Sequence, residues 1–187
     1  MIIITLLTYF YRFQDIEKYV IITIISQILT IILFYYFPAT QAWTFLGIDD
    51  EKLAMFPQIS SSKGTWVSDL LLIRSGALRN LPGLYSSGLI AFPSFHCVAG
   101  LIFIWSSRSL KVFFPTFVIF NSLMIAAAPI VGGHYAVDLI GGACVFVASA
   151  GLTTWIYPRL CLFVASLQSR RFRQILQIEK PKDVRSS

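Results

Sequence analysis

Charged residues are scarce in this sequence. They make up 13% of its 187 residues, whereas an ordinary soluble domain carries about 25%. Hydrophobic residues make up 56%, and the mean hydropathy is +0.72. The sequence has no acidic tail, collagen-like period, coiled-coil heptad or internal repeat. Its apolar residues fall in runs that are too long for a water-soluble core, and these runs indicate an integral membrane protein.

The motifs of several common enzyme classes are also absent. The sequence contains no GxSxG elbow, no HExxH zinc motif and no glycine-rich nucleotide loop. The chain has two histidines, and one carboxylate lies close to them in sequence. These side chains are too few for a typical metal site. The three cysteines have no CxxC spacing and are interpreted as small core residues. We therefore expect neither a metal nor an organic cofactor.

The basic residues argue against a nucleic-acid partner. They lie beside apolar runs and do not alternate with polar and aromatic groups over a soluble surface. Segments 1–18, 106–111 and 159–187 hold 11 of the 15 basic residues. By the positive-inside rule, both termini are then cytoplasmic and the loop 39–87 lies outside. The expected location is the plasma or inner membrane.

The long apolar runs predict an all-α membrane protein, a polytopic bundle of about four transmembrane helices. Pro38 stops the first run, Pro93 lies in the opening turns of the second, and the fourth ends near Pro158. The predicted spans cover residues 19–37, 88–105, 112–131 and 135–157. They form a membrane-embedded domain, 19–158, which includes an outer loop, 39–87, and is followed by a basic cytoplasmic tail, 159–187. A short apolar and basic N-terminal segment, 1–18, precedes it, and its apolar part is either an interfacial segment or the remnant of a longer span.

The two histidines of the chain, His96 and His134, lie at the outer ends of the second and fourth spans. Asp138 follows His134 by four residues, so both side chains share one face of a helix. A carboxylate that accepts a hydrogen bond from one ring nitrogen fixes the tautomer and makes the other nitrogen more nucleophilic. An ionisable residue inside an apolar run is costly and usually functional or paired. A His–Asp pair that only fastens two helices is the alternative.

Other residues near the histidines suit an anionic ligand. Ser94 lies near a helix start, where its hydroxyl and free backbone N–H groups can bind an anion. Residues 66–81 predict a short amphipathic helix at the interface, which carries Arg74 and Arg79. These two arginines either bind the anion or form the solvated face of that helix, and the sequence leaves both interpretations open.

Two of these motifs together resemble a known enzyme family. FPSFH, residues 92–96, and GGHYAVDLIGG, residues 132–142, are similar to the Pro-Ser-Gly-His and His-x-x-x-Asp elements of the type 2 phosphatidic acid phosphatase superfamily. IRSGALRNL and FPATQAW resemble the branch that includes inositol phosphorylceramide synthases and many bacterial membrane phosphatases. The resemblance covers residues 19–158 and corresponds to the last four of the six spans common in relatives. It implies a helical bundle of the acid phosphatase/haloperoxidase type.

The resemblance implies a role for each site residue. His134 would attack phosphorus and carry a phosphohistidine, and Asp138 would orient its ring. His96 would protonate the leaving alcohol. Ser94 and the backbone amides after Pro93 would hold the phosphate oxygens.

The resemblance also has departures. Phe95 stands where many relatives have glycine, and Ala128 stands where the family often has arginine. Arg74 and Arg79 are then the candidate phosphate-binding cations of the outer loop. The expected function is hydrolysis of a membrane lipid phosphate at the outer face. Two alternatives are open: a phosphoinositol-type lipid phosphotransferase that uses an alcohol acceptor, and a catalytically inactive structural or transport protein.

Overall fold

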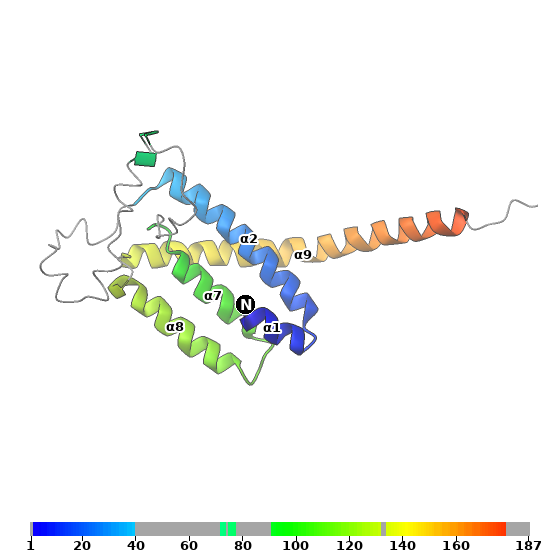
Figure 1. Ribbon diagram of the computed structural model, residues 1–187, viewed down its shortest axis with the longest axis horizontal. Helices are drawn as coiled ribbons and strands as arrows, with labels where there is room; N and C mark the ends of the chain where they lie inside the picture. Colours follow the sequence, from blue (N-terminus) through cyan, green and yellow to red (C-terminus); the bar gives the residue numbers. More distant parts are fainter. Residues whose placement is uncertain (1, 40–71, 74, 78–90, 132–133, 179–187) are drawn as a thin grey trace, which may run out of the picture.

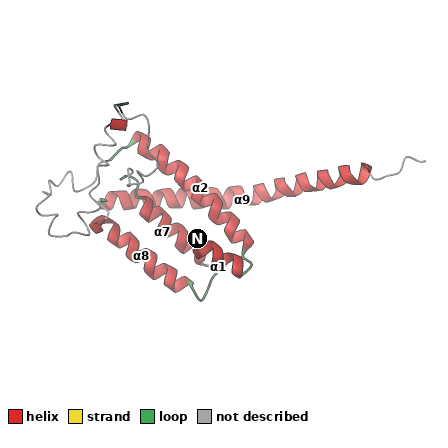
Figure 2. Ribbon diagram, viewed as in Figure 1, coloured by secondary structure: helices red, strands yellow, loops and turns green. Residues whose placement is uncertain are grey.

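The computed structural model describes residues 2–39, 72–73, 75–77, 91–131 and 134–178. Within these ranges all regular secondary structure is α-helical (Figure 2), so the all-α prediction is confirmed. The helices keep the order of the predicted spans, with one short helix before them. Their bounds are α1 Ile2–Tyr9, α2 Phe13–Tyr36, α7 Phe95–Ser107, α8 Phe114–Val131 and α9 Ala136–Ile178.

Two of the helices, α2 and α9, are long and apolar enough to cross a membrane. The apolar helices α7 and α8 are shorter. The 13 residues of α7 rise about 20 Å, less than the hydrocarbon thickness of about 30 Å. The all-helical structure with these two apolar helices is consistent with a helical membrane protein, and the four crossings remain a prediction.

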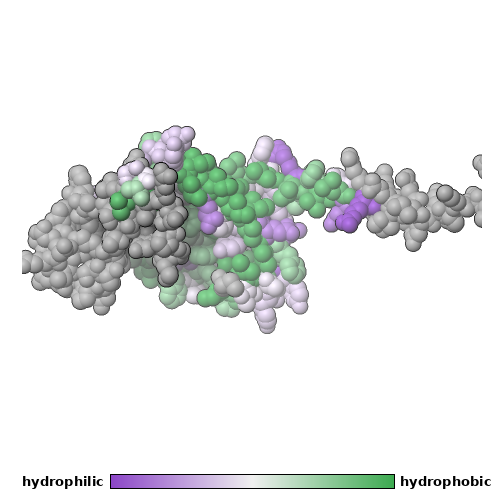
Figure 3. All heavy atoms as spheres, turned by 45° about the horizontal axis from the view of Figure 1, so that its top comes forward, coloured by the Kyte–Doolittle hydropathy of each residue, from purple (hydrophilic) through white to green (hydrophobic). Residues whose placement is uncertain are grey.

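The helices surround a small core. Helix α7 packs against α2, α8 and α9, and α2 also contacts α9, which it crosses obliquely (Figure 1). Ile22 of α2, Val98 and Ile102 of α7 and Val145 of α9 form the buried centre of these contacts. Many large apolar side chains remain exposed, and hydrophobic residues cover most of the visible described bundle (Figure 3). Such a surface is expected where lipid, not water, is the solvent.

The N-terminal segment is helical. Ile3 and Leu7 of α1 are buried in a second small cluster with Leu110, which follows α7. Helix α2 begins at Phe13, six residues before the predicted start of the first span. The polar residues Asp15, Glu17 and Lys18 therefore belong to its first turns, and these residues obscured the boundary in the hydropathy pattern.

The start of α7 differs from its prediction. Pro93 was expected in the opening turns of a span that begins near residue 88, yet the helix begins at Phe95 and Ser94 is its N-cap. The backbone N–H of Ser94 donates a hydrogen bond of 2.9 Å to the carbonyl of Asp138. Ser94 is thus held by α9, and the helix begins after this contact.

The end of α9 also differs from its prediction. The helix continues through Pro158 to Ile178, and 43 residues at the usual helical rise span about 65 Å. Proline removes one backbone donor, but nearby polar groups can satisfy the carbonyls that this leaves exposed. The missing N–H of Pro158 leaves the Thr154 carbonyl without its usual donor. The next carbonyl, that of Trp155, accepts a 2.7 Å hydrogen bond from the Arg159 guanidinium. The distal half of α9 projects away from the other helices (Figure 1).

Candidate active site

The two histidines meet at one end of the bundle. His96 is the second residue of α7, and His134 lies two residues before α9. Nδ1 of His96 lies 3.3 Å from Nε2 of His134, and the ring centroids are 5.4 Å apart. His96 is exposed, whereas the His134 side chain is 6% exposed. The pair therefore combines one accessible imidazole and one held inside the protein.

A backbone carbonyl sets the tautomer of His134. Nδ1 of His134 lies 2.9 Å from the carbonyl oxygen of Ala91. A carbonyl oxygen can only accept a hydrogen bond, so Nδ1 carries the proton. In the neutral ring Nε2 then carries the lone pair, and this is the nitrogen that faces His96. The sequence motif contains no signal for this carbonyl, because its position depends on how residues 91–94 approach α9.

Asp138 lies beside this ring and has a second bond. Its side chain is 1% exposed, and Oδ2 lies 3.6 Å from Nδ1 of His134. The same oxygen accepts a 2.7 Å hydrogen bond from the backbone N–H of Tyr135. The carboxylate therefore caps the start of α9, as acidic side chains in the first turn of a helix often do. The short bond to Nδ1 of His134 that was expected from Asp138 is thus made by the Ala91 carbonyl, and the carboxylate of Asp138 lies farther from the same nitrogen, at 3.6 Å.

Two glycines let α7 approach α9 at this point. A Cβ atom on Gly142 would lie 2.6 Å from the Ser94 carbonyl oxygen and 2.9 Å from the Cβ of Cys97. A Cβ on Gly141 would lie 2.5 Å from the ring of Phe92. These residues were not predicted as part of the site. Their signal is the pair of adjacent glycines one turn after Asp138, since small residues mark close helix contacts in membranes.

The starts of two helices converge on the histidines. Helix α7 begins at Phe95, and its first intrahelical bond runs from the Val98 N–H to the Ser94 carbonyl at 3.2 Å. The N–H groups before Val98 in the first turn have no intrahelical acceptor. The hydroxyl of Ser94 is buried and has no hydrogen-bond partner among the described residues. With the nearby start of α9, these donors and helix dipoles favour an anion beside His96 and His134.

A groove of about 610 Å³ opens next to Asp138. It lies between the end of α2, the segment before α7 and the start of α9, and its walls are mainly apolar. Among the described residues that line it, Asp138 is the one Asp, Glu, His, Lys or Arg side chain. The lining residues are Phe37, Pro38, Ala39, Phe92, Tyr135, Val137 and Asp138.

Comparison with known proteins identifies the family. Residues 1–152 match the family model described as the PAP2 superfamily. The chain belongs to the PAP2 superfamily. This membership indicates phosphatase-type or phosphotransferase-type activity and, with the two long apolar helices, association with a membrane. No curated protein and no solved structure gives a significant match.

The family match confirms the resemblance at the level of the superfamily. It includes residues 1–18, which the predicted resemblance left out, so α1 belongs to the PAP2 region. The inositol phosphorylceramide synthase-like branch stays a prediction.

The PAP2 site residues expected from the sequence fall into two groups. The structure brings His96, His134, Asp138 and the backbone of Ser94 together, while Arg74 and Arg79 lie outside the described residues. Ala128, at the position where the family often has arginine, is 6% exposed in α8. Among the described residues, no group of three or more His, Cys, Asp or Glu side chains is arranged to hold a metal ion.

Proposed function

We propose that this PAP2 protein is a membrane-bound phosphatase that hydrolyses a lipid phosphate through a phosphohistidine at His134. The observation that best supports the proposal is the contact between His134 and His96. One imidazole presents its lone pair because its other nitrogen is tied to the Ala91 carbonyl, and a second imidazole lies 3.3 Å away. The site thus contains one imidazole that can act as the nucleophile and, next to it, a second that can act as the general acid.

In the first step, Nε2 of His134 attacks phosphorus. A bond forms between nitrogen and phosphorus, and the bond between phosphorus and the alcohol oxygen breaks. That oxygen takes a proton from the imidazolium of His96 and leaves as the alcohol. Phosphorylation leaves positive charge on the His134 ring, which still carries a proton on Nδ1. The buried carboxylate of Asp138, 3.6 Å away, stabilises this charge.

In the second step, water attacks the phosphohistidine. Neutral His96 accepts a proton from the water, the phosphorus–nitrogen bond breaks, and inorganic phosphate leaves. The charge on the phosphate oxygens is balanced by the N–H groups at the start of α7 and by the positive ends of α7 and α9. Ser94 and the arginines Arg74 and Arg79 are proposed to add further hydrogen bonds.

The histidine contact must open when substrate binds. A separation of 3.3 Å leaves no space for phosphorus and a leaving oxygen between the two nitrogens. His134 is buried and bonded to Ala91, whereas His96 is exposed. His96 is therefore the ring that turns aside, and catalytic contacts of this kind commonly reach their working geometry only with substrate bound.

The apolar groove supports a lipid as substrate. It opens beside Asp138 and is walled by Phe37, Phe92 and Val137. A phosphate held at the histidines would place the rest of its ester in this groove, where an acyl chain is favoured over a polar group. A transferase would use the same phosphohistidine with an alcohol in place of water.

The first test measures phosphate release from a panel of substrates. The purified protein is given phosphatidic acids of increasing chain length and an aryl phosphate, with and without EDTA. We expect release that survives EDTA and whose kcat/KM rises with chain length. Release that EDTA abolishes would require a metal mechanism, and no release from any substrate would favour the inactive scaffold.

The second test distinguishes binding of the acyl chain in the groove from the catalytic step. Val137 lines the groove and Val147 does not, although both are exposed on α9, by 57% and 66%. Val137→Trp should raise KM for long-chain phosphatidic acid about tenfold and leave the aryl phosphate unaffected, because only the chain needs the groove. Val147→Trp is the matched control and should change neither. Equal effects of Val137→Trp on both substrates would contradict the groove as the acyl site.

We also propose that the histidine site faces the outside and that both termini are cytoplasmic, as the basic residues indicate. In a variant that lacks the three natural cysteines, Ser61→Cys should react with an impermeant thiol reagent in intact cells. Ser187→Cys should react only after the cells are opened. Labelling of position 187 but not 61 would reverse the orientation.

A further inference from the structure

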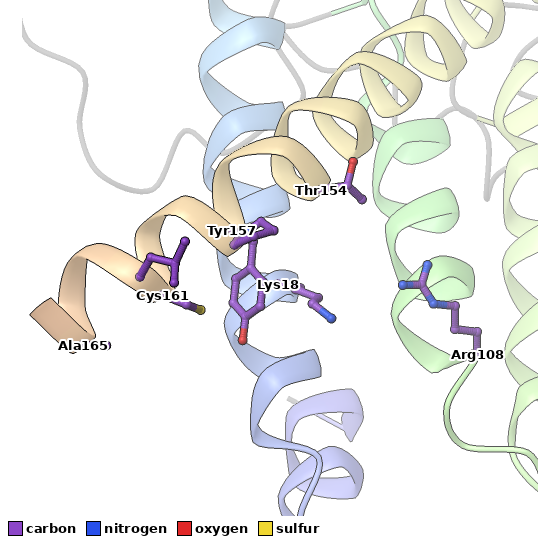
Figure 4. Close-up of a pocket in the computed structure, with 8 residues that line it drawn as sticks. Lys18, Arg108, Thr154, Tyr157, Cys161 and Ala165 are labelled. Carbon is purple, nitrogen blue, oxygen red and sulfur yellow. The ribbon is translucent and has the colours of Figure 1, made fainter.

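A second cavity lies at the other end of the bundle. It has a volume of about 740 Å³ and lies where α2, the end of α7 and the middle of α9 meet (Figure 4). Tyr157 on its wall is roughly five helical turns beyond Asp138 on α9, which is about 28 Å. The cavity and the histidines are therefore about one hydrocarbon thickness apart. The cavity residues are Lys18, Arg108, Thr154, Tyr157, Pro158, Cys161, Leu162 and Ala165.

Two cations face this cavity without a carboxylate partner. Lys18 reaches it from α2 and Arg108 from the end of α7, and their charged groups point toward each other across the space (Figure 4). Neither forms an ion pair with a described residue, and none of the described residues that line the cavity is an aspartate or a glutamate. The nearby carboxylate of Glu17 accepts a 2.8 Å hydrogen bond from the Tyr157 hydroxyl.

Aromatic rings hold both cations in place. The ammonium of Lys18 lies 5.0 Å from the centre of the Tyr157 ring, and the guanidinium of Arg108 lies 4.0 Å from that of Trp105. Such contacts orient a cation without neutralising its charge. Aromatic and basic residues together are also typical of the level at which lipid headgroups meet the hydrocarbon. The two charges thus remain available to an anion at that level.

The rest of the cavity is apolar and borders the distal part of α9. Pro158, Leu162 and Ala165 form this wall. A small soluble anion would leave the wall empty, whereas a phospholipid would fill both parts, its phosphate at the cations and an acyl chain along α9. The proposed cytoplasmic leaflet is also rich in anionic lipids.

We propose that this cavity binds one anionic glycerophospholipid as a structural lipid, with its phosphate between Lys18 and Arg108. This lipid is not the substrate, since it lies at the end of the bundle opposite His134. The inference needs only the membrane environment and does not depend on the phosphatase activity.

Native mass spectrometry of the purified full chain in detergent tests the proposal. Phosphatidylglycerol and phosphatidylcholine with the same acyl chains are added in equal amounts. We expect one tightly held phosphatidylglycerol and at least fivefold less phosphatidylcholine. Lys18→Gln with Arg108→Gln should reduce bound phosphatidylglycerol at least fivefold. Glycerol 3-phosphate, which has the phosphate but no acyl chain, should not displace the lipid.

The matched control removes two charges elsewhere. Lys111 and Arg171 are exposed and lie outside the cavity, so Lys111→Gln with Arg171→Gln should keep the lipid. An equal loss in this control would mean that net charge alone holds lipid and would overturn the proposal. Equal binding of the two lipids by the natural protein would also overturn it.

A third variant keeps both charges and fills the apolar wall. Ala165→Trp should release phosphatidylglycerol as strongly as the double glutamine variant does. Unchanged binding would show that the acyl chain does not lie along this wall and would overturn the proposal. Ala165 is exposed, so its substitution should not disturb folding. The Ala165→Trp variant therefore tests the lipid site even if the double glutamine variant does not fold.

Discussion

The two ends of the bundle use polar side chains in opposite ways. At the histidine end, His134 and Asp138 are buried and contact each other or nearby backbone groups. At the other end, Lys18 and Arg108 face an open cavity and have no carboxylate partner among the described residues. The polar groups of the first end bind each other and the backbone, whereas the cations of the second end are free to bind an anion from outside the protein.

This difference has a physical cause. A nucleophile must be held in one tautomer and orientation, and buried hydrogen bonds supply both. A site for an anionic lipid must instead keep its cations unpaired and reachable from the bilayer, because an internal ion pair would compete with the headgroup. Substitutions at the histidine end should therefore lower turnover. The loss should be largest for the residue that bonds to phosphorus and smaller for residues farther from it.

The largest effect is expected at His134. His134→Ala removes the atom that bonds to phosphorus, so turnover should fall about 10⁴-fold or more. Trapping with radiolabelled substrate should then detect no phosphoenzyme. His96→Ala removes only the acid and should still allow slow phosphorylation by an aryl phosphate, whose leaving group needs little help. A phosphoenzyme in His134→Ala would assign the nucleophile elsewhere.

A smaller effect is expected from Asp138→Asn. The amide oxygen can still accept the hydrogen bond from the Tyr135 N–H, so Tm should change little. The charge beside His134 is lost, and turnover per folded molecule should fall on the order of a hundredfold. If the pair only fastens the bundle, turnover will follow the amount of folded protein, and retention of more than about half would remove Asp138 from the site.

The smallest of the three effects is expected at Gly142. Gly142→Ala places a methyl group against the Ser94 carbonyl, so α7 must shift and both Tm and turnover should fall. Overpacking of this kind costs about 1–3 kcal/mol, and we expect a turnover loss of about tenfold. Gly151→Ala on the same helix is the control, because its methyl group meets no atom within 4 Å. Because alanine has the higher helix propensity, Gly151→Ala should not lower Tm. An equal loss of Tm and turnover at the two glycines would show that the contact with Ser94 is not its cause.

The sequence predicted the helices best where apolar residues form an uninterrupted run. The predicted span 112–131 corresponds to α8, Phe114–Val131, and the predicted start at residue 135 corresponds to the start of α9 at Ala136. The prediction failed where a helix begins with charged residues or continues past a proline that was expected to end it. Helix α2 includes Asp15 and Glu17, and α9 continues through Pro158. Hydropathy detects the part of a helix that suits lipid, whereas backbone hydrogen bonding decides where the helix ends.

The sequence alone determined the fold class, the family resemblance and the His–Asp spacing, because these depend on composition and on residues close together in the chain. Tertiary structure decided the tautomer of His134, which depends on the carbonyl of Ala91, 43 residues away. It also decided the close approach of α7 to α9 at Gly142 and the position of Lys18 and Arg108 on the wall of one cavity. These features depend on which residues the packing of α2, α7 and α9 brings together, and a periodic pattern along one segment cannot specify them.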